Sequence, residues 1–254
     1  MEHGTTEILG IRVDVVTKYE ALEKVAVFLD SQEQSTIFTP NPEMLVDARK
    51  DEYFREVLNS GDLNICDGVG LWLIATLSSK KPERITGMDF LLDICRLAQE
   101  KNKNVYLLGS GDGNVIKSAA EALKRKFSEL KICGFNSGPN IERLEDYKIA
   151  YDETGNEDLL YDIIMKAPDI LFVGFGHGKQ EKWIYENLAQ LPSVKIAMGV
   201  GGAFDFLAGK ARRAPKFMRL LGIEWLWRLV LEPWRVKRIF KATIVFLFYL
   251  IWQK

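Results

Sequence analysis

The feature of this chain that most constrains its fold is a regular alternation of short apolar runs with longer amphipathic segments. Six runs have the length and composition of buried strands, and they are STIFT (35–39), DLNICD (62–67), NVYLLG (104–109), LKICGF (130–135), DILFVGF (169–175) and VKIAMGVG (194–201). Helical periodicity separates them, most clearly over Asp89–Lys101, Asn114–Ser128, Glu157–Lys166 and Lys179–Leu191. This alternation predicts an α/β fold, Rossmann-like, in which helices cover both faces of a mainly parallel sheet.

Two regions depart from this alternation. Residues 136–158 form the longest polar stretch, which we expect to be a surface loop or a short helix. From about Ala214 onward the sequence reads as two amphipathic helices, over residues 216–232 and 234–252, because Pro233 should break or kink a continuous helix. We therefore predict an α/β domain over residues 1–209 and a helical appendage over residues 210–254.

Charge is divided unevenly between these two parts. The formal net charge is −1, yet residues 210–254 hold 11 basic and 2 acidic residues, whereas residues 1–209 hold 23 basic and 33 acidic ones. A basic appendage on an acidic body indicates contact with something anionic, such as phosphate, a lipid surface or nucleic acid. The appendage is too apolar to favour nucleic acid. Its tryptophans suit a membrane interface, and they are Trp225, Trp227, Trp234 and Trp252.

Cysteine usage and the N-terminal sequence indicate the compartment. Cys66, Cys95 and Cys133 are far apart and form no CxxC pair, which is typical of reduced thiols in a cytosolic protein. The N-terminus lacks a basic stretch followed by an apolar run, so we expect no signal peptide. The apolar segment ATIVFLFYLIW is about half as long as the ~20 residues of a membrane-spanning helix. We expect a cytoplasmic protein that associates peripherally with the inner face of the cell membrane.

Polar side chains follow several of the predicted strands. Ligands of open parallel sheets bind beyond the carboxyl ends of the strands, so these positions are candidate site residues. Thr39, Asn41 and Glu43 follow the first strand, and Asp67 ends the second, just before a glycine. A carboxylate held there can act as a general base, whereas the structural alternative is a turn or a helix N-cap.

Two glycine-rich turns are candidate ligand loops. LLGSGDGN (107–114) joins a strand to a helix, but its glycines are spaced GxGxG rather than GxGxxG, and no acidic residue ends the next strand. A nicotinamide-dependent oxidoreductase is therefore an alternative rather than the leading hypothesis. In VGFGHGKQEKWI (173–184), Gln180 or His177 could face a ligand, and His177 is interpreted as a turn residue.

The chain offers little for metal-dependent or nucleophilic catalysis. His3 and His177 are its only histidines, which disfavours a histidine-rich metal site and a Ser-His-Asp triad. No DxD pair is present to hold a divalent ion beside a diphosphate. We therefore expect neither a metal nor a cofactor.

Arginines of the appendage can neutralise a diphosphate instead. Arg228, Arg235 and Arg238 are spaced by seven and three, so they can share one face of a helical segment. Their forked donors match phosphate oxygens, and they could stabilise the charge that develops when a nucleotide sugar releases its diphosphate. The alternative is a basic surface that faces solvent or a membrane.

Six blocks occur in a fixed order, namely TPNPEM, CDGVGLW, RITGMDF, GKQEKWI, GVGGAFDFLAGKARRAPKFM and EWLWRLVLEPWRVKR. Together they resemble the WecG/TagA/CpsF family of glycosyltransferases, over about Ile8 to Arg238. The resemblance implies an inverting, metal-independent enzyme. It would move N-acetylmannosamine from UDP to N-acetylglucosamine on undecaprenyl diphosphate, in the synthesis of the wall teichoic acid linkage unit.

The resemblance also implies roles for individual residues. Asp67 would be the catalytic base on the acceptor hydroxyl. The residues implied to bind substrate are Thr39, Asn41, Arg84 and Gln180 around the sugar, Asp205 at the nucleoside, and Arg228, Arg235 and Arg238 at the UDP diphosphate. The chain departs from the family at Gly178, where a proline is usual.

Some alternatives stay open at this point. The donor could be another UDP-sugar, such as the uronic acid of N-acetylmannosamine or glucose, for an exopolysaccharide or surface antigen. A nicotinamide enzyme and a non-enzymatic membrane adaptor are the other classes, and a homo-oligomer is open. We expect the appendage to anchor the protein and to close over the site, and the alternative is a helical pair docked permanently on the body for stability. Removal of the residues after Gly209 should then abolish turnover while the α/β body stays folded.

Overall fold

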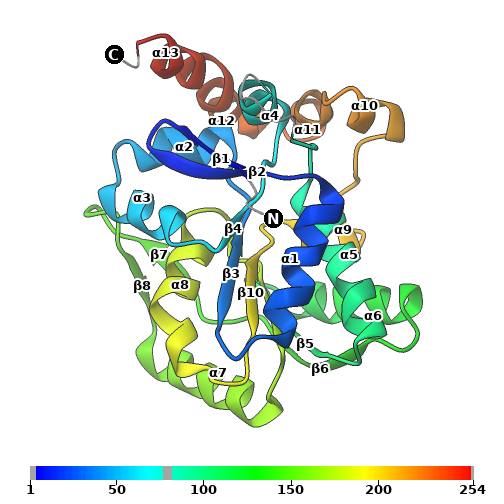
Figure 1. Cartoon of the computed structure of the whole chain (residues 1–254). Coiled ribbons are helices and arrows are strands. Elements are labelled where there is room, and N and C mark those ends of the chain that lie inside the picture. Colours follow the sequence, from blue (N-terminus) through cyan, green and yellow to red (C-terminus); the bar gives the residue numbers. More distant parts are fainter. Residues whose placement is uncertain (1–3, 77–81, 253–254) are drawn as a thin grey trace.

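The computed structural model describes residues 4–76 and 82–252, and its centre is a six-stranded parallel sheet (Figure 1). The strand order is β4-β3-β10-β9-β5-β6. The strands are β3 (Ser35–Phe38), β4 (Leu63–Asn64), β5 (Asn104–Leu108), β6 (Lys131–Asn136), β9 (Ile170–Val173) and β10 (Ile196–Gly199). Each corresponds to one of the apolar runs, so the predicted α/β fold with a parallel sheet is confirmed.

Helices cover both faces of the sheet and build two hydrophobic cores (Figure 1). Along β5 the side chains alternate, so that Tyr106 and Leu108 enter one core while Val105 and Leu107 enter the other. Helices on the first face are α2 (Pro42–Ala48), α3 (Glu52–Asn59), α7 (Glu153–Lys166) and α8 (Lys179–Asn187), the last followed by a 3-10 turn (Leu188–Gln190). Helices on the second face are α1 (Lys18–Asp30), α5 (Gly87–Glu100), α6 (Gly113–Lys126) and α9 (Ala203–Leu207).

Local sequence explains where these helices begin. Thr17 and Glu20 form a reciprocal capping box at the start of α1. Asn41 caps α2 and Thr86 caps α5, each by accepting a backbone N–H in the first turn. Helix α4 (Val69–Ala75) begins instead at Gly68, whose φ of +94° suits glycine. Asn41 and Gly68 therefore lie next to the strand-end residues Thr39 and Asp67.

Two antiparallel hairpins lie outside the main sheet. The N-terminal one joins β1 (Gly4–Ile8) to β2 (Ile11–Val15). The other joins β7 (Ile141–Arg143) to β8 (Ile149–Tyr151), within the polar region predicted to be a loop or short helix. The prediction of a loop or short helix was therefore wrong. The hairpin has only three residues in each strand and contributes few side chains to the core, such as Ile141, so its sequence reads as polar.

The C-terminal helices run along one end of the molecule (Figure 1). The helix expected over residues 216–232 is broken into α10 (Lys216–Leu220) and α11 (Glu224–Leu231) at Gly222, whose φ is +72°. A Cβ at Gly222 would lie 2.1 Å from Val69 Cγ2, so only glycine fits this contact with α4. The expected break at Pro233 is present as a 3-10 turn (Pro233–Arg235).

Beyond Pro233 the chain forms α12 (Val236–Phe240), one π-helical turn (Lys241–Val245) and α13 (Phe246–Ile251). Phe246 is 1% exposed and belongs to the same core as Leu45 of α2 and Leu71 of α4. This segment is therefore docked on the α/β body through a buried aromatic side chain.

Candidate active site

Thr39 and Asp67 lie side by side at the carboxyl ends of β3 and β4. The backbone N–H of Asp67 donates to the carbonyl of Pro40 at 3.2 Å, which ties the two strand-end loops together. A Cβ on Gly87, the first residue of α5, would lie 3.5 Å from Thr39 Oγ1 and 3.8 Å from Asp67 Oδ2. The parallel sheet thus brings two of the predicted site residues to the N-terminus of one helix.

Asp67 has an unusual electrostatic environment. Burial, reinforced by the nearby carboxylate of Glu224, raises the pKa of Asp67 to about 6. The backbone N–H of Gly87 and the charges of Arg84 and Arg228 oppose this shift without cancelling it. A carboxylate with this pKa is ionised at neutral pH yet basic enough to accept a proton, as a general base requires.

Two predicted substrate ligands carry structural hydrogen bonds. Asn41 Oδ1 accepts from the Met44 N–H at 3.1 Å, so the helix-cap alternative is what the structure shows for this oxygen. Gln180 Nε2 donates to Glu181 Oε1 and its Oε1 accepts from the Gly201 N–H, both at 2.8 Å. Gln180 is buried, and it joins α8 to the loop after β10. Contact of either amide with a sugar stays a prediction.

The turn before Gln180 explains one departure from the family pattern. Gly178 has a φ of +77°, and a Cβ there would lie 2.3 Å from Arg143 Nη2. Proline, with its φ fixed near −65°, cannot adopt this conformation. The turn of this chain therefore has a backbone that requires glycine.

Arg228 and Asp205 both lie beside Gly202. A Cβ on Gly202 would lie 3.7 Å from both Arg228 Nη2 and Asp205 Oδ2. The Arg228 guanidinium lies 4.9 Å from the centre of the Phe206 ring. Its Nε is buried without a hydrogen-bond partner in the described part of the chain, and burial lowers the pKa of Arg228, as does the charge of Arg235. An anion here would satisfy an arginine that is costly to leave unpaired.

Asp205 also lines a cavity of about 150 Å³ at the ends of β5, β9 and β10. Gly109 and Ser110 of the first glycine-rich turn lie on its wall, together with Gly174. Lys210 Nζ lies 3.8 Å from Asp205 Oδ1 at the rim. The GxGxG turn thus faces the same region as the residue predicted to contact the nucleoside.

The other two arginines predicted to hold the diphosphate are already paired. Arg235 Nε donates to Glu232. Arg238 binds Glu43 through both Nε, at 2.9 Å from Oε1, and Nη2, at 2.8 Å from Oε2. Arg228 and Arg238 still feel each other's charge, so the three guanidinium groups lie in one region. Of the three, only Arg228 has a buried donor without a partner among the described residues.

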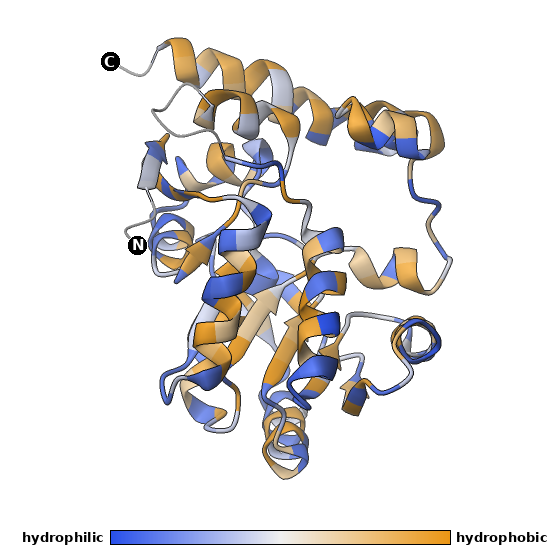
Figure 2. Ribbon diagram, turned by 45° about the vertical axis from the view of Figure 1, so that its right-hand side comes forward, coloured by the Kyte–Doolittle hydropathy of each residue, from blue (hydrophilic) through white to orange (hydrophobic). Residues whose placement is uncertain are grey.

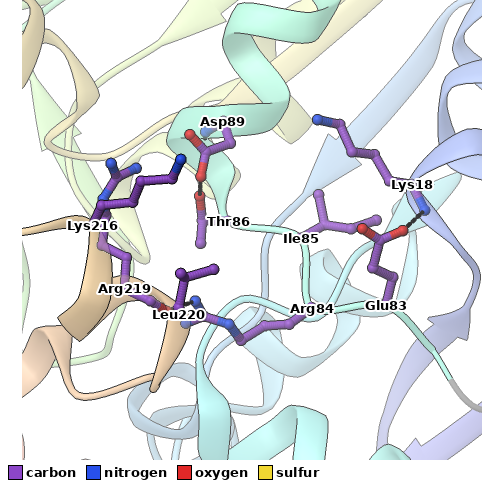
Figure 3. Close-up of a pocket in the computed structure, with 9 residues that line it drawn as sticks. All are labelled: Lys18, Glu83, Arg84, Ile85, Thr86, Asp89, Lys216, Arg219 and Leu220. Atoms are coloured by element: carbon purple, nitrogen blue, oxygen red, sulfur yellow. Dashed lines mark hydrogen bonds between the residues drawn. The ribbon is translucent and has the colours of Figure 1, made fainter.

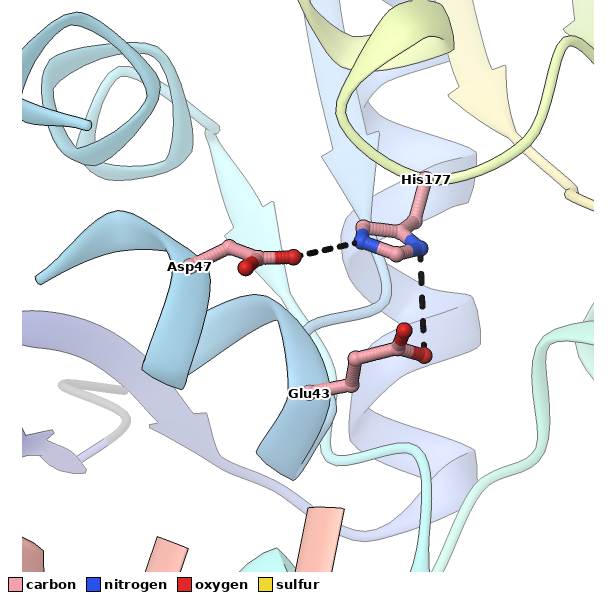
Figure 4. A group of neighbouring side chains, drawn as sticks. All are labelled: Glu43, Asp47 and His177. Carbon is pink, nitrogen blue, oxygen red and sulfur yellow. Dashed lines mark hydrogen bonds and ion pairs between the residues drawn. The ribbon is translucent and has the colours of Figure 1, made fainter. Parts of the chain in front are cut away.

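Glu43 belongs to a compact ionic cluster with Asp47 and His177 (Figure 4). His177 Nε2 lies 2.9 Å from Asp47 Oδ2, and the ligating atoms of all three side chains lie within 4.8 Å of one another. That spacing could hold a metal ion. However, Arg238 and Lys241 of the appendage already contact the two carboxylates. Although burial opposes it, hydrogen bonds from His177 and Lys241 lower the pKa of Asp47.

This cluster is the feature that the sequence did not reveal. His177 was interpreted as a turn residue, and it does lie in a turn, but its ring bridges α2 to the appendage. The only sequence signal is the i, i+4 spacing of Glu43 and Asp47, which places both carboxylates on one face of α2. The cluster thus links three segments that are far apart in sequence.

Arg84 is a second arginine whose charge acts on Asp67. Its Nη1 is 3.6 Å from Glu224 Oε1, and its Nη2 donates to the carbonyl of Arg219. It lines a cavity of about 260 Å³ between the start of α5 and helix α10 (Figure 3). Asp67 is therefore flanked electrostatically by an arginine of the body and an arginine of the appendage.

The parallel sheet places a carboxylate of raised pKa and several arginines at its carboxyl edge, an arrangement that can bind an anionic substrate. The chain belongs to the glycosyl transferase WecG/TagA/CpsF family, whose family model matches residues 6–254. It is therefore a glycosyltransferase, which decides against the oxidoreductase and adaptor alternatives.

Two relatives share the name N-acetylglucosaminyldiphosphoundecaprenol N-acetyl-beta-D-mannosaminyltransferase. The protein of Bacillus subtilis (strain 168) is 31% identical over 212 residues, which cover 83% of this chain and 77% of the relative. The protein of Staphylococcus aureus (strain NCTC 8325 / PS 47) is 30% identical over 246 residues, which cover 95% of this chain and 90% of the relative.

Exposed apolar side chains are concentrated on the C-terminal helices. Much of the ribbon of these helices has the hydrophobic colour in Figure 2. Trp234, Ile251 and Trp252 are each more than two-thirds exposed, at 73%, 76% and 71%. Among the described residues, no helix combines the length and apolarity needed to cross a membrane.

Proposed function

We propose that this glycosyltransferase moves N-acetylmannosamine from UDP-N-acetylmannosamine to N-acetylglucosamine carried on undecaprenyl diphosphate, in wall teichoic acid linkage-unit synthesis. The names of both relatives support this donor sugar and this acceptor. The observation that carries the chemistry is the environment of Asp67, a partly buried carboxylate of raised pKa at the sheet edge, with arginines in electrostatic reach.

The reaction is a single displacement. Asp67 takes the proton of the acceptor hydroxyl while the hydroxyl oxygen attacks the anomeric carbon of the donor. The bond from that carbon to the β-phosphate oxygen breaks, and UDP leaves with the electron pair. Attack from the face opposite UDP inverts the anomeric configuration, so one base is enough and no covalent sugar–enzyme intermediate forms.

Arg228 is the residue best placed to stabilise the leaving UDP. Its unpartnered buried Nε and its lowered pKa indicate a guanidinium that gains from an incoming anion. Arg235 and Arg238 add positive charge nearby, and Asp205 lies where the cavity beside the GxGxG turn would take the nucleoside. These four side chains supply the donor site, and arginine replaces a divalent ion as the counter-charge.

The appendage, residues 210–254, has two roles in this proposal. Its arginines complete the site of the α/β domain over residues 1–209, and its exposed tryptophans and apolar side chains contact an anionic membrane surface, where the lipid-linked acceptor lies. The protein would then act as a peripheral enzyme on the cytoplasmic face.

The test is UDP release from UDP-N-acetylmannosamine in the presence of EDTA, with a lipid-diphosphate N-acetylglucosamine acceptor. Wild type is expected to turn over, and Asp67→Asn should lower kcat by about two orders of magnitude or more because the base is lost. Asp146→Asn, in an exposed loop, is the matched control.

The outcomes separate the parts of the proposal. Turnover only with another UDP-sugar would overturn the donor, and turnover only after addition of a divalent ion would overturn the metal-free mechanism. Full activity of Asp67→Asn would remove Asp67 as the base.

A further inference from the structure

A cavity beside the start of α5 lies close to Asp67. Thr86, on its wall, immediately precedes Gly87, whose N–H contacts Asp67. The cavity holds about 260 Å³. An acceptor sugar whose hydroxyl reaches Asp67 would therefore have its next chemical group within or beside this cavity.

The wall of this cavity is cationic. Four basic and two acidic residues line it, namely Lys18, Arg84, Lys216, Arg219, Glu83 and Asp89. The excess of positive charge favours an anion, and the planar guanidinium groups match phosphate oxygens.

Both acidic groups of the wall already have partners. Asp89 forms a two-pronged ion pair with Arg213, at 2.8 Å from Nη1 and 2.7 Å from Nη2. Glu83 accepts the backbone N–H of Lys18 at 2.9 Å. Neither carboxylate is therefore a free charge that would repel an incoming anion at full strength.

Two of the four basic side chains have an anionic partner. Lys18 Nζ lies 2.6 Å from Asp93, and Arg84 forms an ion pair with Glu224. By contrast, neither Lys216 nor Arg219 forms an ion pair with any carboxylate of the described residues, and Arg219 Nε is buried without a hydrogen-bond partner. Figure 3 shows both side chains reaching from α10 toward the start of α5. A buried donor without a partner at a cavity wall indicates a missing acceptor.

An apolar surface begins where this cationic wall ends. Leu220, which also lines the cavity, is 77% exposed, and its neighbours Phe217 and Leu221 are 60% and 68% exposed. From Asp67 outward the structure presents a carboxylate, then the basic side chains of the cavity wall, and then the exposed apolar side chains of α10. A sugar, a diphosphate and a prenyl chain follow each other in the same order in the proposed acceptor.

We infer that Lys216 and Arg219 bind the diphosphate of the lipid-linked acceptor in this cavity, apart from the UDP diphosphate, while Leu220 and Phe217 contact the first part of the lipid chain. The inference rests on the proposed function for the identity of the acceptor. It also gives α10 a role in acceptor recognition, whereas the arginines from Arg228 onward serve the donor.

A binding experiment tests this without turnover. A short-chain alkyl diphosphate is titrated into the full-length protein with UDP at saturation, so that the donor site is filled. Lys216→Ala and Arg219→Ala should each weaken binding about tenfold, because each removes a charge-assisted contact. Arg212→Ala, which removes a neighbouring positive charge outside the cavity wall, should change it less than about twofold.

Inorganic diphosphate is the second probe, and it separates a lipid diphosphate from a free anion. Wild type should bind the alkyl diphosphate more tightly than the inorganic ion, and Leu220→Ser should reduce that preference without changing affinity for the inorganic ion. Equal affinity for the two probes in wild type would overturn the lipid assignment. Unchanged binding in the Lys216→Ala/Arg219→Ala double variant would overturn the site.

Kinetics then separates this inference from the proposed function. With a soluble short-chain acceptor, the double variant should raise KM for the acceptor and leave KM for the UDP-sugar within about twofold. A rise in donor KM alone would place these residues at the donor and overturn the inference. Absence of UDP release by wild type with every donor would count against the proposed function, while the binding result would still decide the site.

Discussion

Arg238 of the appendage binds Glu43 of α2 with two parallel contacts, and Glu43 is in turn 3.9 Å from His177. A guanidinium has five N–H donors. Glu43 accepts from Nε and from Nη2, and Nη2 also lies 3.3 Å from His177 Nδ1. The two hydrogens of Nη1 remain for another acceptor. Glu43 can therefore hold the Arg238 side chain in place while Nη1 of Arg238 contacts a phosphate oxygen of the donor.

Glu43→Gln should raise KM for the UDP-sugar about fivefold, because Arg238 loses the charged partner that fixes its orientation. The KM for the acceptor should change little. Steady-state UDP release at varied donor measures this, with Glu52→Gln, an exposed carboxylate of α3, as the control. A lower donor KM in Glu43→Gln would show instead that Glu43 competes with the diphosphate for Arg238.

The pH profile of kcat/KM should report Asp67. Since the base must be deprotonated, the rate should rise about tenfold per pH unit below the pKa of about 6 and become level above it. Glu224→Gln should move the inflection to lower pH, because the Glu224 charge contributes to the raised pKa of Asp67. Glu157→Gln, on exposed surface of α7, should leave the profile unchanged. An inflection in Glu224→Gln at or above the wild-type pH would contradict this electrostatic account.

The same raised pKa affects stability with the opposite sign. Because the folded protein favours the protonated form of Asp67, this group stabilises the fold fully below its unfolded-state pKa of about 4. That contribution is lost as the pH rises through about 6. The carboxylate that we propose as the base is therefore ionised at neutral pH at the expense of some stability of the fold.

Phe246→Ala should lower the free energy of unfolding by about 3 kcal/mol, because the side chain is 1% exposed and leaves a cavity against α2 and α4. Phe248→Ala, at 54% exposure two residues away, should change it by less than about 0.5 kcal/mol. Urea-induced unfolding at fixed pH gives both values. Equal, small effects would mean that α13 is only loosely docked on the body.

Binding to anionic vesicles should depend on the exposed aromatic side chains of the appendage. Trp234→Ser combined with Trp252→Ser is expected to reduce the fraction that sediments with vesicles, by about tenfold in partition coefficient. Added salt should weaken binding of wild type, since basic residues contribute about 1 kcal/mol each near such a surface. Tyr19→Ser removes an aromatic ring of 70% exposure on α1 and should have no effect. Vesicle binding that is equal in all three proteins would argue against this surface.

The order of secondary structure was predictable because the core strands are continuous apolar runs. The β7–β8 hairpin was not, since its strands contain charged residues such as Glu142 and Arg143 and end at a turn around Tyr147, which has a φ of +67°. The break at Gly222 was missed for a related reason. A glycine within an amphipathic pattern costs a helix only about 1 kcal/mol, so the pattern alone does not reveal that Val69 excludes a side chain there.

The sequence was enough to predict which residues lie near the sheet edge, but not which of them contact one another. Thr39 and Asp67 meet because parallel strands end at one edge, which the alternation of strands and helices implies. The pairing of Arg238 with Glu43 depends on how the appendage docks, and no local pattern contains that information. The same holds for His177, whose partners lie 130 and 134 positions earlier in the chain.

The contact between Gly222 and Val69 matters for inhibitor design. Val69 follows Asp67 by two residues, so the bend between α10 and α11 packs against the helix that begins just after the proposed base. A compound that bound between Gly222 and Val69 would act on the segment that carries the proposed base without resembling a nucleotide sugar or a prenyl diphosphate. Its potency would then not fall as either substrate accumulates, which is the usual weakness of competitive inhibitors.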